Sequence, residues 1–175
     1  MFRTISLTAL LTGILDISAA VFKFYIDTDQ GAKLKMAPGG EAEPVSFFTF
    51  LSSGGPDRIF KYIATGIFGS GSSISNTLMI TWGIVFHFMI AFFFTAFLFI
   101  IYPTLISWLK NKFITGFLYG LFIWAVMNLV VLPLSHVRRP PFDSTDAAIQ
   151  ALILISMVGI PAVLIADNFH RKKRM

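Results

Sequence analysis

The sequence TLMITWGIVFHFMIAFFFTAFLFII, at residues 77–101, contains no Asp, Glu, Lys or Arg. At about 1.5 Å of rise per residue, a helix of this length exceeds the roughly 30 Å thickness of a bilayer's hydrocarbon core. An uninterrupted apolar stretch of this kind is typical of a membrane-spanning helix. The bilayer is therefore the expected surrounding of the chain.

The composition of the whole chain also favours a membrane location. Of the 175 residues, 55% are hydrophobic and 13% are charged, whereas about 25% of the residues in ordinary soluble domains are charged. One small water-soluble core cannot hide so much apolar surface, which excludes a soluble globular enzyme and a disordered chain. The absence of cysteine excludes disulfides, thiolate metal sites and catalytic thiols. Much of the net charge of +5 flanks the apolar stretches, so no nucleic acid partner is expected.

Three further apolar stretches have the length of a membrane span. They lie at about 4–24, 113–134 and 147–167. The first resembles a signal peptide because Arg3 precedes it, but Asp16 at its centre favours a retained span. Together the four stretches predict a single all-α membrane domain over residues 1–175, an integral membrane four-helix bundle.

The loop between the first two spans contains a predicted amphipathic helix at about 56–69. Pro56 and Asp57 suit the start of a helix, and Gly69 suits its end. The apolar side chains of this segment share one helical face. We expect the helix to lie on the outer surface, over the mouth of the bundle, and residues 27–55 to form a flexible polar loop.

The basic residues indicate how the chain is oriented in the bilayer. With four spans, both termini lie on the same side as the short loop that carries Lys110 and Lys112. That side also holds Arg3 and the basic tail at residues 171–174, whereas most basic residues of the other side are scattered over the long first loop. The positive-inside rule therefore predicts a multi-pass protein with cytoplasmic termini and the lipid bilayer as its partner.

Three polar side chains are expected inside the membrane, where an unpaired polar group is costly. Asp16, His87 and Asn128 belong to three different spans. With the termini inside, a rise of about 1.5 Å per residue from each span centre places all three in the outer half of the bundle. We call these three residues the polar layer. They form the candidate site if their helices face a common axis.

Two interpretations of the polar layer are open. In the structural one, Asp16 and His87 form a hydrogen-bonded pair and Asn128 bonds a backbone carbonyl. In the functional one, the same residues bind or pass a small solute or a proton. Lys23, two turns outward from Asp16, is expected to extend toward the lipid headgroups rather than to join the layer.

Small residues recur at helical spacing within the spans. The candidate packing glycines are Gly13, Gly83, Gly116 and Gly120, the last two forming a GxxxG pair. A residue without a side chain lets two helices approach closely. These glycines support an alternative function, a scaffold or subunit whose helices dock a second copy of the chain or a partner membrane protein.

A third hypothesis is an enzyme that acts on lipid headgroups. Its base would be His87 or His136. Arg138 and Arg139 would hold the phosphate or another anion, although two arginines before a Pro-rich turn also suit a simple interfacial anchor. The chain has no HExxH, Walker A or GxSxG motif and no identifiable paired nucleophile. A non-enzymatic role is therefore favoured, and neither a metal nor a cofactor is expected.

Several motifs in the second half of the chain follow one another in a recognisable order. They are His87-Phe88, Gly116-Phe117-Leu118-Tyr119-Gly120, Met127-Asn128, Leu132-Pro133-Leu134-Ser135 and Pro140-Pro141-Phe142-Asp143, followed by the basic tail after the last span. Over roughly residues 76–170 the chain resembles the YagU-like family of uncharacterised bacterial inner-membrane proteins. The resemblance implies a location in the bacterial inner membrane and a helical multi-span fold. It implies no reaction, cofactor or catalytic residue.

Overall fold

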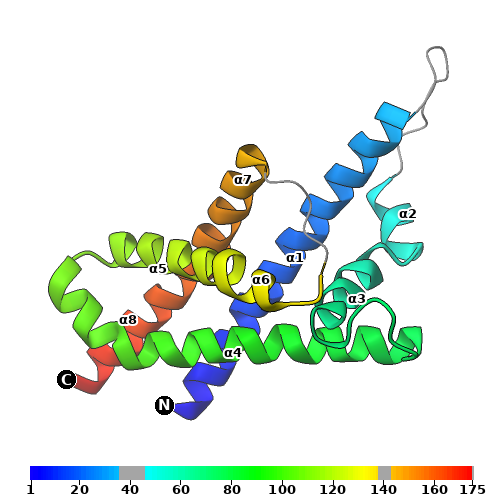
Figure 1. Cartoon of the computed structure of the whole chain (residues 1–175). Coiled ribbons are helices and arrows are strands. Elements are labelled where there is room, and N and C mark those ends of the chain that lie inside the picture. The colour runs from blue at the N-terminus through cyan, green and yellow to red at the C-terminus, as the bar shows by residue number, and fades with distance from the viewer. Residues whose placement is uncertain (36–45, 138–142, 175) are drawn as a thin grey trace.

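A computed structural model describes residues 1–35, 46–137 and 143–174. The regular structure of these residues is entirely helical, and two of the elements, η1 and η2, are π-helical turns (Figure 1). The elements in chain order are α1 (Phe2–Lys35), α2 (Phe47–Ser52), α3 (Gly55–Phe68), α4 (Asn76–Leu109), α5 (Lys112–Val126), η1 (Met127–Val131), α6 (Leu132–Leu134), α7 (Ser144–Leu154), η2 (Ile155–Gly159) and α8 (Ile160–Arg174).

Four helical segments are long and apolar enough to cross a membrane. They are Phe2–Asp27, Asn76–Leu109, Lys112–Leu134 and Ser144–Lys172. The third comprises α5, η1 and α6, and the fourth comprises α7, η2 and α8. The prediction of an all-α, four-helix membrane domain is confirmed, and the chain is a multi-pass membrane protein.

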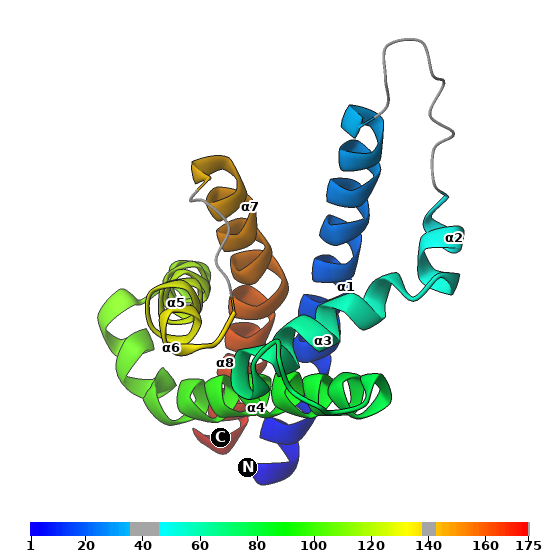
Figure 2. The same ribbon diagram turned by 45° about the vertical axis from the view of Figure 1, so that its right-hand side comes forward.

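The second and third spans are joined by a two-residue turn. Lys110 ends α4 in a left-handed conformation, with φ of 54°. The side chain of Asn111 accepts hydrogen bonds from the backbone N–H groups of Phe113, at 2.8 Å, and Ile114, and so caps α5. Both views show α1 and the α7–η2–α8 segment crossing α4, with the two chain termini at the same end of the molecule (Figures 1 and 2).

The core and the lipid-facing surface are both apolar. Leu98, Phe99 and Val163 are fully or almost fully buried between α4 and α8. Phe93 and Ile100, on the same α4 helix, are 66% and 67% exposed. Large exposed apolar side chains on a span suit contact with lipid chains, so α4 separates a protein-facing side from a lipid-facing side.

Prolines explain both π-helical turns. η1 ends two residues before Pro133, and η2 ends two residues before Pro161. A proline in a helix lacks an N–H, and its ring clashes with the carbonyl four residues earlier. Those carbonyls belong to Leu129 and Met157, which lie within the two widened turns. The widening accommodates the proline ring without ending the span.

A third proline, Pro103, supports a contact between α4 and α8. Because Pro103 has no N–H to give to the Phe99 carbonyl, that oxygen is available to another donor. The Nε2–H of His170 donates to it at 3.1 Å. Beside this contact the Tyr102 hydroxyl donates to the Asp167 carboxylate at 3.0 Å. This polar contact, which no pattern in the sequence predicts, fastens α8 to α4 near the chain termini.

The first loop differs from the expectation of a flexible polar segment over residues 27–55. α1 continues to Lys35, and residues 47–52 form the short helix α2. The backbone N–H of Thr49 donates to the Ser46 hydroxyl, which caps α2, and the rings of Phe47 and Phe50 pack on Tyr25 with centroids 5.2 and 5.5 Å away. That expectation is therefore wrong for these two segments, because α1 continues as a helix and aromatic packing on Tyr25 orders α2. Residues 36–45 lie outside the described residues.

The predicted amphipathic helix is confirmed as α3, with Pro56 in its first turn. It lies against the first half of α4 (Figures 1 and 2). The contact is so close that a Cβ atom on Gly83 of α4 would overlap the carbonyl group of Phe60. α3 is therefore held on the bundle itself, where it contributes to the wall of the cavity described below.

Candidate functional site

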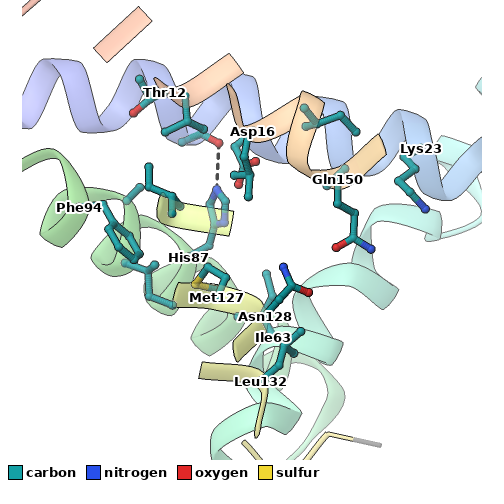
Figure 3. A pocket seen from close by; sticks show the side chains of 18 of the residues that line it. Thr12, Asp16, Lys23, Ile63, His87, Phe94, Met127, Asn128, Leu132 and Gln150 are labelled. Atoms are coloured by element: carbon teal, nitrogen blue, oxygen red, sulfur yellow. Dashed lines mark hydrogen bonds between the residues drawn. The ribbon is translucent and has the colours of Figure 1, made fainter. Parts of the chain in front are cut away.

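A cavity of about 440 Å³ lies between α1, α3, α4 and the third and fourth spans (Figure 3). At its deep end it is lined by the polar layer, and at the other end, which we call the mouth, by Lys23, Asp27 and Gln150. The wall between these polar ends is largely apolar. It includes Phe24, Ile63, Phe94, Ile123, Met127 and Leu154.

The structure thus places all three residues of the polar layer on one cavity. Asp16 comes from α1, His87 from α4 and Asn128 from the π-helical turn η1. In Figure 3 His87 extends toward α1, and Asn128 extends into the space between η1 and α1. A π-helical turn changes which side chains face inward, and such turns are frequent at functional sites.

His87 connects the two helices on which the deep end is built. Its Nε2–H donates to the backbone carbonyl of Gly13 in α1, with a nitrogen–oxygen distance of 2.9 Å. Gly13 permits this approach, because a Cβ there would lie 2.9 Å from the ring of Phe88. A carbonyl can only accept, so the Nε2 atom of His87 carries a proton, and in the neutral form of the ring Nδ1 is an acceptor.

Asp16 is close enough to His87 for an electrostatic interaction. However, its carboxylate accepts no hydrogen bond from any residue that the structure describes. The hydrogen-bonded pair of the structural interpretation is therefore not formed, because the His87 proton is used by Gly13. The other half of that interpretation holds, since the Asn128 amide donates to the Trp124 carbonyl at 3.0 Å.

Lys23 lies at the mouth in a group of ion pairs. Its ammonium group is 2.7 Å from the Asp27 carboxylate and 2.5 Å from that of Asp146 in α7. The Gln150 amide donates to the same Asp146 carboxylate at 2.6 Å. The expectation that Lys23 extends to the lipid headgroups is wrong, because two carboxylates hold it against the protein. Its side chain is 21% exposed, whereas that of Asp27 is 55% exposed, so the mouth reaches the surface.

The mouth residues were partly detectable in the sequence. Lys23 and Asp27 are spaced i, i+4, which places them on one helical face. Asp146 and Gln150 have the same spacing in α7. The side chain of Asp143 caps the start of this helix, because its carboxylate accepts a hydrogen bond from the backbone N–H of Thr145. Nothing in the sequence indicates that these two helices face each other.

The ion pairs at the mouth are expected to contribute modestly to stability. Lys23→Met should lower the free energy of unfolding by about 1 kcal/mol, because both carboxylates that it contacts are partly exposed. Asp146→Asn should cost a similar amount, and the double variant should cost less than the sum of the two. Unfolding in detergent micelles measures all three values. Strict additivity would show that Lys23 and Asp146 do not interact.

α3 closes one side of the cavity with Tyr62 and Ile63. Burial raises the pKa of the Tyr62 hydroxyl above its ordinary value. Tyr62 therefore stays protonated and uncharged at neutral pH, and it gives the cavity a polar but neutral edge.

The remaining candidate residues lie elsewhere. The backbone N–H of His136 donates to the Gly66 carbonyl at 3.0 Å, which fastens the end of the third span to α3. Arg138 and Arg139 lie outside the described residues. Gly116 and Gly120 approach Ile160 and Ile155 of the fourth span. The GxxxG pair therefore packs against a helix of the same chain.

Comparisons of the chain with protein-family models, with curated proteins and with solved structures give no match.

Proposed function

We propose that this chain is a non-enzymatic inner-membrane protein that binds a small solute in the cavity between its spans, with Asp16, His87 and Asn128 as the binding residues. The observation that carries the proposal is the state of Asp16. Its carboxylate lines a cavity of about 440 Å³ and accepts no hydrogen bond from the described residues. A carboxylate at membrane depth is costly unless it is paired, and ionisable residues of this kind mark solute or proton pathways.

The size and lining of the cavity also support a binding role. Small-molecule sites commonly have volumes of roughly 300–1,000 Å³, apolar walls and a few polar groups that fix the ligand's orientation. The cavity has this composition, with an apolar wall between the polar layer and the mouth. The partly exposed ion pairs of Lys23 at the mouth give a solute a route from the surface to Asp16.

The proposal includes a bacterial inner-membrane location, cytoplasmic termini and membership of the YagU-like family. Its support is the distribution of basic residues and the order of the motifs quoted above. With this orientation the mouth of the cavity opens toward the outer side of the membrane.

The two alternative functions are less well supported. A scaffold that docks a partner through Gly116 and Gly120 would have to displace Ile160 and Ile155, which already occupy those surfaces. For a lipid-headgroup enzyme, the ring hydrogen bonds of His87 and His136 within the described residues go to the backbone carbonyls of Gly13 and Gly66, so neither histidine is paired with a nucleophile. Neither alternative explains why a carboxylate faces the cavity.

Native mass spectrometry of the 19.5 kDa chain, extracted gently from its own membranes, tests the proposal. We expect the wild type to carry an additional small-molecule mass and Asp16→Asn to lose it, because the substitution removes the charge but keeps the shape of the side chain. Asp167→Asn is the matched control. It alters an intramembrane carboxylate that hydrogen-bonds Tyr102 and does not line the cavity, so the bound mass should remain.

A wild type that carries no additional mass and also binds no added small-molecule probe would overturn the proposal. So would a bound molecule that stays in Asp16→Asn. Size-exclusion profiles and thermal unfolding of each variant separate loss of ligand from loss of fold.

A further inference from the structure

The groups at the deep end of the cavity are predominantly hydrogen-bond acceptors. The Nε2–H of His87 is used by the Gly13 carbonyl, so the neutral form of the ring offers the Nδ1 lone pair. Asn128 uses an amide N–H on the Trp124 carbonyl, which leaves its Oδ1 as an acceptor. The Asp16 carboxylate adds two acceptor oxygens. A ligand that satisfies these groups has to bring several N–H or O–H donors of its own.

The negative charge of Asp16 at the deep end favours a positively charged ligand. Among the described residues that line the cavity, Lys23 is the one with a permanent positive charge. It lies about 10 Å of helix rise from Asp16, and its ammonium group is already paired with Asp27 and Asp146. An anionic ligand would meet the Asp16 carboxylate unfavourably, whereas a cation would neutralise it.

The wall of the cavity distinguishes an organic cation from a metal ion. No group of three or more His, Cys, Asp or Glu side chains in the described residues could hold a metal ion. A small inorganic ion at the deep end would make no contact with the apolar side chains that line the cavity between the deep end and the mouth. Phe24 and Phe94, which belong to this wall, offer aromatic surfaces that attract organic ammonium groups and their apolar bodies.

We propose that the solute is a protonated organic amine, whose ammonium group is bound by Asp16, Asn128 and His87 and whose apolar body lies along the wall toward the mouth. This inference rests on the proposed function, because it names the chemical class of the solute at the same site. An ammonium group supplies three N–H donors and one positive charge, and the deep end offers acceptors and one carboxylate.

A series of three probes of nearly equal size tests the proposal. Phenethylamine is protonated at neutral pH, phenethyl alcohol is neutral, and phenylacetate is an anion. Binding of each probe to the purified chain is measured by native mass spectrometry and by titration calorimetry, with empty detergent micelles as the blank. We expect phenethylamine to bind the wild type saturably and about tenfold or more tighter than phenethyl alcohol, since a charge-assisted hydrogen bond is then formed. Phenylacetate should show no saturable binding.

The variants Asp16→Asn and Asp167→Asn test whether the preference for the amine over the alcohol depends on Asp16. In Asp16→Asn the ratio of amine to alcohol affinity should fall to near one, whereas in Asp167→Asn it should stay as in the wild type. An alcohol that binds as tightly as the amine, or an amine preference that survives in Asp16→Asn, would overturn the assignment of the ligand class.

The assignment can fail while the proposed function stands. If the wild type carries a co-purifying mass that depends on Asp16 but binds none of the probes, or if that mass is an anion, the site binds a solute and the amine assignment is wrong. If no mass co-purifies and no probe binds, both proposals are overturned.

Discussion

Gly159→Ala is expected to lower the free energy of unfolding by about 3 kcal/mol or more, at the upper end of what overpacking costs. Gly159 lies in η2, at the contact between the third and fourth spans. A Cβ atom there would overlap the Gly116 carbonyl oxygen and lie 2.8 Å from the backbone nitrogen of Gly120. Backbone atoms of a helix cannot rotate away as side chains do, so one span has to move. Denaturant titration in micelles, followed by circular dichroism, measures the loss.

A graded series of Gly→Ala variants controls this prediction. Gly120→Ala should be similarly severe, because its Cβ would lie 2.5 Å from the Ile155 Cα. Gly116→Ala should be milder, since its nearest contact is the Ile160 Cα at 2.9 Å. Gly71→Ala should change little, because no atom lies within 4 Å of the added carbon. If Gly159→Ala were as stable as Gly71→Ala, the spans would not be in backbone contact there.

The sequence predicted the spans well because their length has a simple physical cause. A hydrocarbon core of about 30 Å demands roughly 20 apolar residues, and four stretches of the described residues meet this demand. The packing glycines follow from a similar constraint, since two helix backbones approach closely only where side chains are absent. Gly83, Gly116 and Gly120 lie at such close approaches, whereas a Cβ atom on Gly13 would meet the ring of Phe88.

The sequence predicts the depth of the polar layer in the membrane but not the hydrogen-bond partners of its residues. A fixed rise per residue places Asp16, His87 and Asn128 at similar heights, and all three line one cavity. Height does not determine rotation about the helix axis, so the choice of Gly13 as the partner of His87 was not predictable. The contact between Lys23 and Asp146 was not predictable either, because it also depends on how each helix is rotated about its axis.

The sequence contains a signal for the π-helical turns, namely the two prolines that follow them. Pro133 and Pro161 lie within apolar stretches, where a proline forces the preceding turn to widen or kink. Widening at η1 affects the helix that carries Asn128. The prolines thus help to determine which groups face the cavity, although neither proline lines it.

Gly83→Ala is expected to open the cavity by moving α3 away from α4. The added Cβ would overlap the Phe60 carbonyl and lie 2.8 Å from the Phe60 Cα, so the two helices cannot keep their present distance. A displaced α3 takes Tyr62 and Ile63 out of the cavity wall. An amine bound there should then lose affinity by about tenfold, because a wall contact of this size contributes about 1–3 kcal/mol.

Because the chain has no cysteine, a single introduced thiol can report this movement. Ala64 of α3 is fully buried, so in Ala64→Cys the thiol should react slowly with a maleimide, and about tenfold faster once Gly83→Ala is added and α3 opens. Gly66→Ala is the matched control in α3, since its added Cβ would meet Ser135 and Val137 only at 3.5 and 3.6 Å. It should leave the labelling rate unchanged. Equal rates with and without Gly83→Ala would mean that α3 keeps its position, and any loss of amine affinity would then need a cause other than the cavity wall.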